Sequence, residues 1–585
     1  MDRKVNRIKL IKLYSEPKVF EPINFSDGVN IILGEKFDEA TTNGRKTIGV
    51  GKSLSIEFIN FCLLKKYSDS RLQLIPKEIL NVTVLIKLDL EIGNNQLTIV
   101  RNRKEQDQPV IIKENKETKF ESIDDAQQYL SDLIYKNNTL QVVPSFRELL
   151  SPLIRDERSE FNNILESFDI NKKIPFNLVP HLFFLNIPIE LFKKVQDTIK
   201  KIDNESKIAS NAKRELTENK KKIKDVKAEL NALNDEIEKI TEAVDNFKSN
   251  EAFSTIQNDI IQMEDLLDKL RVRQNSIKYE LQKIKSLPEP ETIENEEMEL
   301  IYNKFKEGLG DFIIKSLDET IAFKERIESF QRTLINQKSI DLQNELDEIT
   351  SNIKKLDNEI SHKLKLINQK GVLKDLKSSI KILNQKNVDY SRKQNKFNEY
   401  ESAEKEKKAL NLQKTQELLS LDKAIENNRL ILDSFLETIL EIHEFIMGNK
   451  ECSFDIETID KKRSKKFVNI DLRIYDDGSH SVDRTKVFIY DVALLFNEFT
   501  SNHHPLLLIH DNIFDVDKDT LIQSLNLLAK KETEVSNFQY ILTLNRDKIE
   551  HEEQSELLKL NINEHKVATF TKEKKFLGVN YQEIN

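Results

Sequence analysis

The sequence predicts an α/β fold that is split around a long antiparallel α-helical coiled coil. Strand-like apolar segments are concentrated in residues 1–186 and 446–585. The residues between them, 187–445, contain almost no proline or glycine and carry apolar residues at seven-residue repeats, a pattern typical of coiled coils. Because an antiparallel coil brings the chain back to where it left, we expect the two ends to complete one sheet.

Both ends alternate apolar segments with amphipathic ones, as mixed α/β structure does. Helical patterns follow Lys52 and cover residues 484–498 and 518–531. The segments that resemble strands are residues 8–13, 29–33, 82–92 and 97–103 near the start, and 452–459, 466–476, 505–511 and 538–544 near the end.

Two apolar seams predict the coiled coil. One runs from Ile223 to Phe247 at alternating spacings of three and four, and a second runs from Leu342 to Ile360. A single stripe would also fit an amphipathic helix on a globular core. Two stripes in a long segment poor in proline and glycine favour a left-handed coiled coil.

The break in the coil is expected at the segment LPEPE, residues 287–291. An outgoing helix over 187–287 would be roughly 150 Å long at 1.5 Å per residue. A return helix of equal length would begin near 345, which leaves an apical element of short helices at about 288–344. The expected domains are therefore an N-terminal lobe (1–186), a coiled-coil arm (187–445) and a C-terminal lobe (446–585).

Composition and charge argue against several classes of protein. Charged residues make up 33% of the 585 residues and the formal net charge is −9, so any contact with DNA must come from a local basic patch. Two cysteines, Cys62 and Cys452, cannot build a disulfide framework or a CxxC zinc site. No apolar run is long enough to span a membrane, and we therefore expect a cytoplasmic location.

A glycine-rich segment, GVGKS, predicts a phosphate-binding loop between a strand and a helix. Gly49 and Gly51 would let backbone N–H groups wrap the phosphates, Lys52 would reach the β and γ phosphates, and the Ser53 hydroxyl would ligate Mg²⁺. A chance GKS in an ordinary loop is the alternative. The apolar strand before the segment and the amphipathic helix after it favour a site for ATP and Mg²⁺.

The phosphate loop departs from the uninterrupted pattern on its N-terminal side. An uninterrupted loop of this type has a further glycine at the position of Lys46. Gly34, at the end of the preceding strand, could fill that role if residues 36–47 bulge outward.

A buried apolar strand near the C-terminus, PLLLIHDNIFDVD, ends in acidic residues of the kind that hold Mg²⁺ and polarise water. Its register is ambiguous. In one register His510 occupies the metal-binding position and Asp511 the catalytic acid. In the other, Asp511 binds the metal and Asn512 replaces a catalytic glutamate. Neither register gives an ordinary Asp-Glu pair, and a plain buried strand that ends in Asp is the alternative.

A basic run in the C-terminal lobe is the candidate contact with DNA phosphates. A solvated hairpin explains the same run equally well. Its members are Lys461, Lys462, Arg463, Lys465 and Lys466.

The order of these motifs resembles that of SMC-like ABC ATPases, in which a phosphate loop, a long coil, a signature segment and an acid-ending strand follow one another. GVGKSL, IHD and FDVD are most similar to a bacterial anti-phage defence subfamily, the SMC-like subunits of Lamassu systems (LmuB-like). The resemblance covers both lobes and the plan of the arm, and it implies an α/β ABC-type ATPase head built from both lobes.

The resemblance also assigns further residues. Gly478, Ser479 and Ser481 stand where a signature motif would contact the γ-phosphate held by a second head, although the glycine pair of that motif is missing. Asp517 stands at the aspartate of the D-loop, and Asn545 stands where a switch histidine is usual. The Q-loop is expected within SFRELLSPLIR, without a clear glutamine.

The implied function is a homodimer that closes its heads on ATP, engages DNA and controls an effector such as a nuclease, together with a small accessory subunit. The altered acids predict slow hydrolysis that DNA or a partner stimulates. Two alternatives stay open. One is a DNA-repair ATPase of RecN or nuclease-associated type, and the other is a structural clamp that binds ATP without hydrolysing it.

Overall fold

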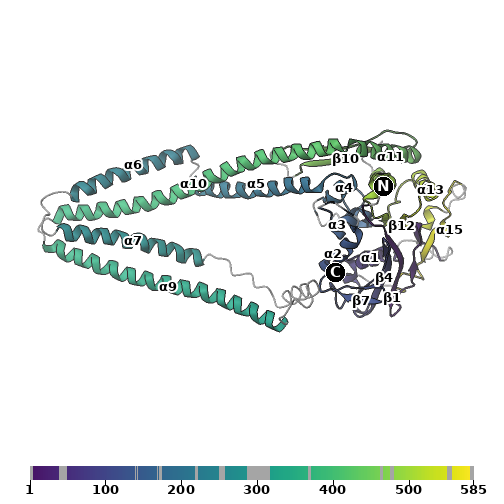
Figure 1. The fold of residues 1–585 in the computed structure, drawn as a ribbon, viewed down its shortest axis with the longest axis horizontal. Helices are drawn as coiled ribbons and strands as arrows, with labels where there is room; N and C mark the ends of the chain where they lie inside the picture. The colour runs from purple at the N-terminus through teal and green to yellow at the C-terminus, as the bar shows by residue number, and fades with distance from the viewer. Residues whose placement is uncertain are drawn as a thin grey trace. The chain divides into compact units, whose positions relative to one another are not determined.

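The chain forms two compact units, each with its own set of internal contacts (Figure 1). Unit 1 contains residues Met1–Asp197, Asn303–Gly308 and Lys414–Asn585, and unit 2 contains Thr198–Tyr302 and Leu309–Gln413. The computed structural model describes residues 4–37, 49–136, 138, 140, 142–167, 169, 174, 176–217, 222–248, 257–285, 317–366, 370–461, 466–474, 480–549 and 557–579.

Unit 1 is built around a parallel sheet to which both ends of the chain contribute. The strand order is β13-β3-β12-β11-β8, and every neighbouring pair is parallel. β3, β11 and β12 are buried along their whole length, which explains why they read as continuous apolar runs. The strands are β3 (Gly28–Gly34), β8 (Ile154–Arg155), β11 (Leu507–His510), β12 (Gln539–Asn545) and β13 (Lys566–Phe570).

A second sheet in unit 1 is antiparallel, with the order β2-β1-β4-β5-β6-β7. Burial alternates along β4 because successive side chains of a strand point to opposite faces. Helix α1 (Lys52–Cys62) contacts both sheets, through β3 and through β4 and β5. The strands are β1 (Ile8–Glu16), β2 (Ile23–Asn24), β4 (Leu85–Ile92), β5 (Asn95–Arg101), β6 (Val110–Lys113) and β7 (Lys116–Lys119).

The remaining elements of unit 1 pack around these sheets. β9 (Cys452–Thr458) and β10 (Val468–Ile474) form a separate antiparallel hairpin. The helices are α2 (Ile123–Ile134), α3 (Phe146–Leu150), α4 (Val179–Phe184), α11 (Arg429–Met447), α12 (His480–Phe496), α13 (Lys518–Glu534) and α15 (Ile562–His565).

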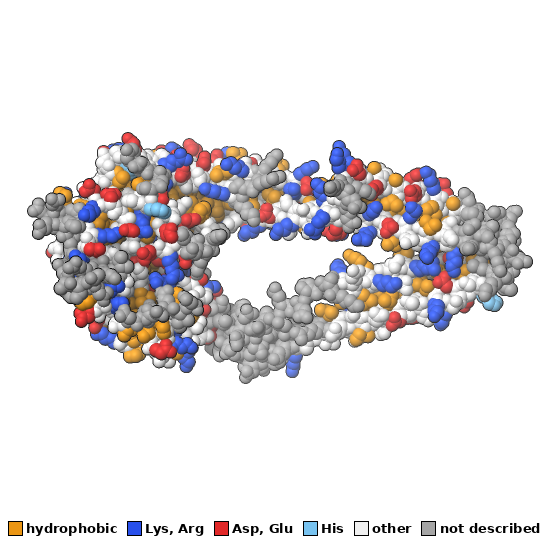
Figure 2. All heavy atoms as spheres, turned by 180° about the vertical axis from the view of Figure 1, so that it is seen from behind, with side chains coloured by type: hydrophobic (Ala, Val, Ile, Leu, Met, Phe, Trp, Pro, Cys, Tyr) orange, Lys and Arg blue, Asp and Glu red, His pale blue; other side chains and the backbone are white. Residues whose placement is uncertain are grey.

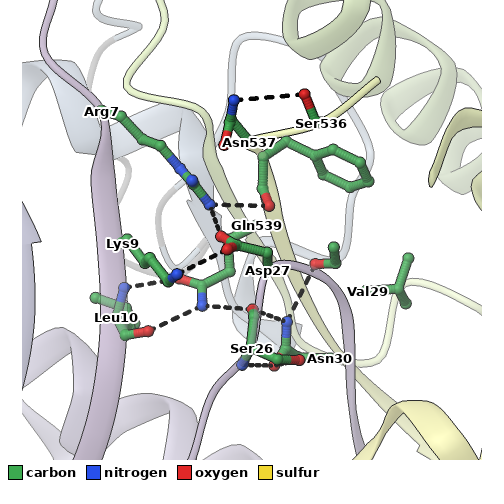
Figure 3. Close-up of polar contacts among 12 residues, drawn as sticks. Arg7, Lys9, Leu10, Ser26, Asp27, Val29, Asn30, Ser536, Asn537 and Gln539 are labelled. Atoms are coloured by element: carbon green, nitrogen blue, oxygen red, sulfur yellow. Dashed lines mark hydrogen bonds and ion pairs between the residues drawn. The ribbon is translucent and has the colours of Figure 1, made fainter. Parts of the chain in front are cut away.

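One side chain joins the two sheets and the two ends of the chain (Figure 3). The Gln539 amide accepts from the N–H of Leu10 at 2.8 Å and donates to the carbonyl oxygens of Leu10 and Ser26, both at 2.9 Å. Arg7 donates to the carbonyl oxygen of Phe538 at 3.1 Å and also binds Asp27. The polar start of β12 is therefore paired directly with β1 and with the turn before β3.

Unit 2 consists of long helices that pair in antiparallel fashion. In one pair, Val226 and Leu230 of α6 pack against Phe397 of α10. Ion pairs on the same helices join Glu229 to Lys393 and Glu236 to Lys386. Residue numbers rise along α6 while those of their partners fall along α10, so the two helices are antiparallel. The helices of the coil are α5 (Ile189–Leu216), α6 (Ile223–Lys248), α7 (Gln257–Lys285), α9 (Leu317–Leu366) and α10 (Lys370–Asn427), and both α5 and α10 continue into unit 1.

The second helix pair joins α7 to α9. Ile277 and Leu281 pack against Leu342 and Ile349, and Arg273 binds Glu345 at 2.7 Å. Both apolar seams predicted from the sequence therefore face a partner helix. Along the faces seen in Figure 2, lysine and arginine side chains are mixed with acidic ones, as the solvated sides of a coil require.

The predicted fold class is confirmed: an α/β head assembled from both ends of the chain, plus paired long helices. The apical element expected at about 288–344 falls outside the described residues as far as residue 316, and residues 317–344 are the first part of α9. None of the helices in the described ranges combines the length and hydropathy needed to cross a bilayer.

Candidate nucleotide-binding site

The predicted phosphate loop leads directly into α1. Gly51 caps this helix at φ +104°, and Gly49 has φ +69°, a region that favours glycine. A Cβ on Gly51 would lie 2.6 Å from the Cβ of Phe576. The loop therefore needs glycine both for its backbone angle and for the close approach of Phe576. Most of the predicted outward bulge at 36–47 lies outside the described residues.

Lys52 begins α1 and reaches across to the C-terminal lobe. Its Nζ donates to Oδ1 of Asn545 at 2.6 Å, and the side chain is buried. Burial lowers the pKa of Lys52, while the nearby carboxylates of Asp511, Asp547 and Glu157 act in the opposite direction. Gly34 pairs with Asn545 in the parallel sheet. Asn545, at the end of β12, therefore contacts both Gly34 and Lys52 of the N-terminal lobe.

Asp511 lies beside Ser53. The Ser53 hydroxyl acts on the Asp511 carboxylate in the direction that lowers its pKa, and this carboxylate accepts a hydrogen bond from Thr543 Oγ1 at 2.8 Å. Burial raises the pKa of Asp511 to about 6. A hydroxyl and a carboxylate next to a phosphate loop are the oxygen donors that Mg²⁺ takes together with phosphates, so these two residues fit the ion. Within the described ranges, no group of three or more His, Cys, Asp and Glu side chains could hold a metal without such outside ligands.

His510 faces away from Ser53 and into a buried polar network. Its Nε2 donates to Asp491 Oδ2 at 2.9 Å, since that carboxylate can only accept, and its Nδ1 accepts from the Tyr540 hydroxyl at 2.9 Å. Arg155 binds the same Asp491 at 2.6 Å, and all of these side chains are buried. Burial lowers the pKa of His510. The candidate catalytic His510 is thus placed as a neutral bridge between α12, β11 and β12.

Sequence reasoning missed this network, because its members carry no shared motif. Arg155 belongs to β8, whose two residues are too short for a periodic signal. Asp491 lies in the middle of an otherwise apolar helix, α12. That buried acid in an apolar helix was the signal available in the sequence, because a buried charge needs a partner.

Asn512 follows Asp511 at φ +61°. Its N–H donates to Thr543 Oγ1 at 2.8 Å, and its side-chain amide donates to Glu157 Oε1 at 3.1 Å. Its carbonyl oxygen accepts from Arg484 of α12 at 2.7 Å. Glu157 comes just after the region expected to contain the Q-loop, and sequence reasoning did not single it out.

Ser481 and Asp517, assigned to the signature and the D-loop, are neighbours. Asp517 donates its N–H to Ser481 Oγ at 3.3 Å. Its carboxylate caps α13 by accepting from the N–H of Thr520 at 3.0 Å. Ser481 lies in the first turn of α12, whereas Gly478 and Ser479 lie outside the described residues.

The basic run lies between β9 and β10. Lys461 and Lys466 are exposed at either side of it, and Lys462, Arg463 and Lys465 lie outside the described residues. The strands on both sides pair in register, for example Val468 with Thr458. The run therefore connects the two strands of the β9–β10 hairpin.

A cavity of about 470 Å³ lies beside Phe576. Phe576, which touches Gly51, is one of its walls. The loop between β1 and β2 forms another wall, and the β13 strand a third. Its lining includes Lys18, Phe20, Thr569, Phe570, Lys574 and Phe576.

Comparison with known proteins relates both lobes to families. Residues 7–245 match the family described as "AAA domain", and residues 439–581 match the family described as "Uncharacterised protein conserved in bacteria (DUF2326)". No curated protein matches the chain.

Two solved structures are similar to the chain along most of its length. One is the Smc head domain with a coiled coil and joint from Pyrococcus yayanosii, with 12% identity, a TM-score of 0.33 and 94% of each chain covered. The other is the Smc head domain with an extended coiled coil, bound to the C-terminal domain of ScpA, from Pyrococcus furiosus. Its identity is 10% and its TM-score 0.31, with 92% of this chain and 90% of that chain covered. The match of residues 7–245 to an AAA domain implies ATP binding.

Proposed function

We propose that this chain is an SMC-like ATP-binding subunit that dimerises through its heads, senses or clamps DNA, and controls a partner effector in bacterial anti-phage defence. One observation carries the nucleotide part of the proposal. Lys52 and Ser53 from the N-terminal lobe meet Asn545 and Asp511 from the C-terminal lobe at one edge of the parallel sheet. An ATP-dependent signal between the lobes needs such a shared site.

The residues at this edge have complementary tasks. The backbone of Gly49 and Gly51 offers N–H groups to the phosphates, and the N-terminus of α1 adds its positive end. Lys52 supplies a cation. Ser53 and Asp511 would hold Mg²⁺, which when bound neutralises phosphate charge. The cavity walled by Phe576 is the proposed place for the nucleoside.

Head closure is proposed to complete the site in trans. Ser481 lies at the N-terminus of α12, where N–H groups and a hydroxyl can receive a phosphate. Because Lys52 holds the nucleotide of its own head, Ser481 is proposed to reach the γ-phosphate held by a second copy. Such an arrangement needs two copies related by a two-fold axis.

The DNA and defence parts of the proposal have different support. Exposed Lys461 and Lys466 offer cations for phosphates. The segments GVGKSL, IHD and FDVD resemble the subunits of anti-phage systems, and the match of residues 439–581 to a family conserved in bacteria agrees with that origin. The proposed effector is a nuclease or a similar enzyme, assisted by a small accessory subunit, and the proposed location is the cytoplasm.

A second candidate function is a clamp that holds ATP without turnover. It is favoured by the amides at Asn512 and Asn545, because neither can act as a base toward water. A repair ATPase of RecN or nuclease-associated type would instead hydrolyse ATP steadily. Genes next to this one would separate the biological roles, since a small helical protein and an effector gene favour defence.

The test measures binding and turnover separately. Calorimetry with ATP and Mg²⁺ should give one nucleotide per head, and phosphate release should be slow in the protein alone and faster with linear duplex DNA. Absence of nucleotide binding would remove the proposal. Binding with no turnover under any condition would favour the clamp, and brisk turnover by the protein alone would favour the repair ATPase.

A further inference from the structure

Two neighbouring strands deliver similar sequences to the same edge of the parallel sheet. β8 and β11 are parallel, with Ile154 opposite Ile509 and Arg155 opposite His510. The Asp511 N–H continues the pairing by donating to the Arg155 carbonyl oxygen at 2.9 Å. The segment IRDE (154–157) therefore runs beside the segment IHDN (509–512).

The register places Glu157 next to Asn512. Each of the two residues stands two positions beyond the last matched pair, and the Asn512 amide donates to Glu157 Oε1 at 3.1 Å. Glu157 is exposed, in the short 3-10 helix that follows β8. Its carboxylate also acts electrostatically on both Asp511 and Lys52. The carboxylate missing after Asp511 is thus present just beyond the end of the adjacent strand, β8.

We propose that Glu157, which follows β8, is the general base of ATP hydrolysis in this chain, in place of the acid that Asn512 replaces after β11. The inference rests on the proposed function and deepens it. Asn512 then has a task of its own, because its amide hydrogen holds one oxygen of Glu157 and leaves the other for water.

The proposed step is a simple hydrolysis. The oxygen of a water molecule bonds to the γ-phosphorus of ATP, and the bond from that phosphorus to the β,γ-bridging oxygen breaks. The electron pair leaves with ADP. The proton of the attacking water passes to the free oxygen of Glu157, which later releases it to solvent. A positioned base of this kind contributes about 10²- to 10⁴-fold to the rate.

Two other acids at this edge, Asp156 and Asp511, are engaged elsewhere. Asp156 caps the short helix by accepting from the N–H of Arg158 at 2.8 Å. Asp511 accepts a hydrogen bond from Thr543 and is the proposed metal ligand. Glu157 accepts the Asn512 amide at one carboxylate oxygen, Oε1, and its other oxygen is available for water.

The experiment removes the carboxylate at position 157 and then places one at position 512. Glu157→Gln should lower DNA-stimulated phosphate release by about 10²-fold or more and leave the Kd for ATP within about twofold. Asn512→Glu added to Glu157→Gln should return most of the lost rate, because the acid then stands after Asp511. Glu160→Gln, a nearby exposed position in the same segment, is the matched control and should hydrolyse like the parent.

The outcomes separate the inference from the function on which it rests. Parent-like turnover by Glu157→Gln overturns the general base. Slow turnover by Glu157→Gln that Asn512→Glu does not restore also overturns it, because a purely structural role of Glu157 would give slow turnover without rescue. A parent that binds ATP and never hydrolyses it also overturns the inference while it leaves ATP binding intact. A parent that fails to bind ATP removes the proposed function itself.

Discussion

The ammonium group of Lys52 donates a hydrogen bond to the amide oxygen of Asn545, with an Nζ–Oδ1 distance of 2.6 Å. Lys52 begins α1 and Asn545 ends β12, so this one contact joins the two ends of the chain at the proposed phosphate site. Phosphates bound at Lys52 would share its ammonium group with Asn545, because that group has three N–H donors. The pair therefore links occupancy of the site to the relation between β12 and α1.

Lys52→Ala should weaken ATP binding by about 10- to 100-fold, because hydrogen bonds to charged groups contribute about 1.5–3 kcal/mol. Calorimetry with ATP and Mg²⁺ measures the change. Lys104→Ala, at an exposed loop position, should bind like the parent. Equal affinity of the Lys52→Ala variant and the parent would show that phosphates bind elsewhere.

The raised pKa of Asp511 predicts a pH-dependent stability. Burial raises it from 3.8 to about 6, so the folded state keeps a proton that the unfolded chain has lost in that range. Stability therefore falls as pH rises from about 4 to 6, and the penalty of about 2–3 kcal/mol persists above pH 6. Asp511→Asn removes the titration and should raise the thermal midpoint of the nucleotide-free protein more at pH 8 than at pH 4.

The same substitution should abolish Mg²⁺-dependent effects on nucleotide binding, because the carboxylate is a proposed ligand of the ion. Thermal midpoints measured with ATP, with and without Mg²⁺, report this. An Asp511→Asn variant that still gains stability from Mg²⁺ with ATP would contradict the assignment, and a parent-like pH dependence would contradict the titration.

His510→Ala should reduce stability and leave nucleotide binding nearly unchanged. The substitution leaves the Tyr540 hydroxyl without a partner and removes one donor from Asp491, at a cost of about 2–4 kcal/mol in the free energy of unfolding. Chemical denaturation measures it. His480→Ala, at an exposed position, is the control. A stable His510→Ala variant that has lost Mg²⁺-dependent ATP binding would favour the register with His510 at the metal.

Ser481→Arg should bind ATP normally and fail to close the heads, because the bulky cation would occupy the place of the γ-phosphate from the second copy. Cysteines placed across the proposed head interface report closure through ATP-dependent cross-linking. Ser536→Arg, at an exposed turn, should cross-link like the parent. Cross-linking of Ser481→Arg at the parent level would mean that the signature lies elsewhere.

The sequence by itself determined the paired helices, the split α/β head and the glycine-containing loop that leads into α1. These depend on signals that are local along the chain. Seven-residue spacing from Ile223 and from Leu342 is enough to predict coiled-coil helices, and continuous apolar runs are enough to predict buried strands such as β3 and β12. Gly51 before Lys52 is similarly local, because the cap of a helix and its backbone angle are set within a few residues.

Only the tertiary structure decided what surrounds the ends of β8 and β11. His510 ends β11 and Asp511 continues its direction, so the two side chains point to opposite faces. The packing of α1 against one face put Asp511 beside Ser53 and left His510 to Asp491. Glu157 came to Asn512 through the pairing of β8, a two-residue strand with no periodicity of its own. Contacts between residues hundreds of positions apart depend on how the sheet assembles, and no local pattern encodes that assembly.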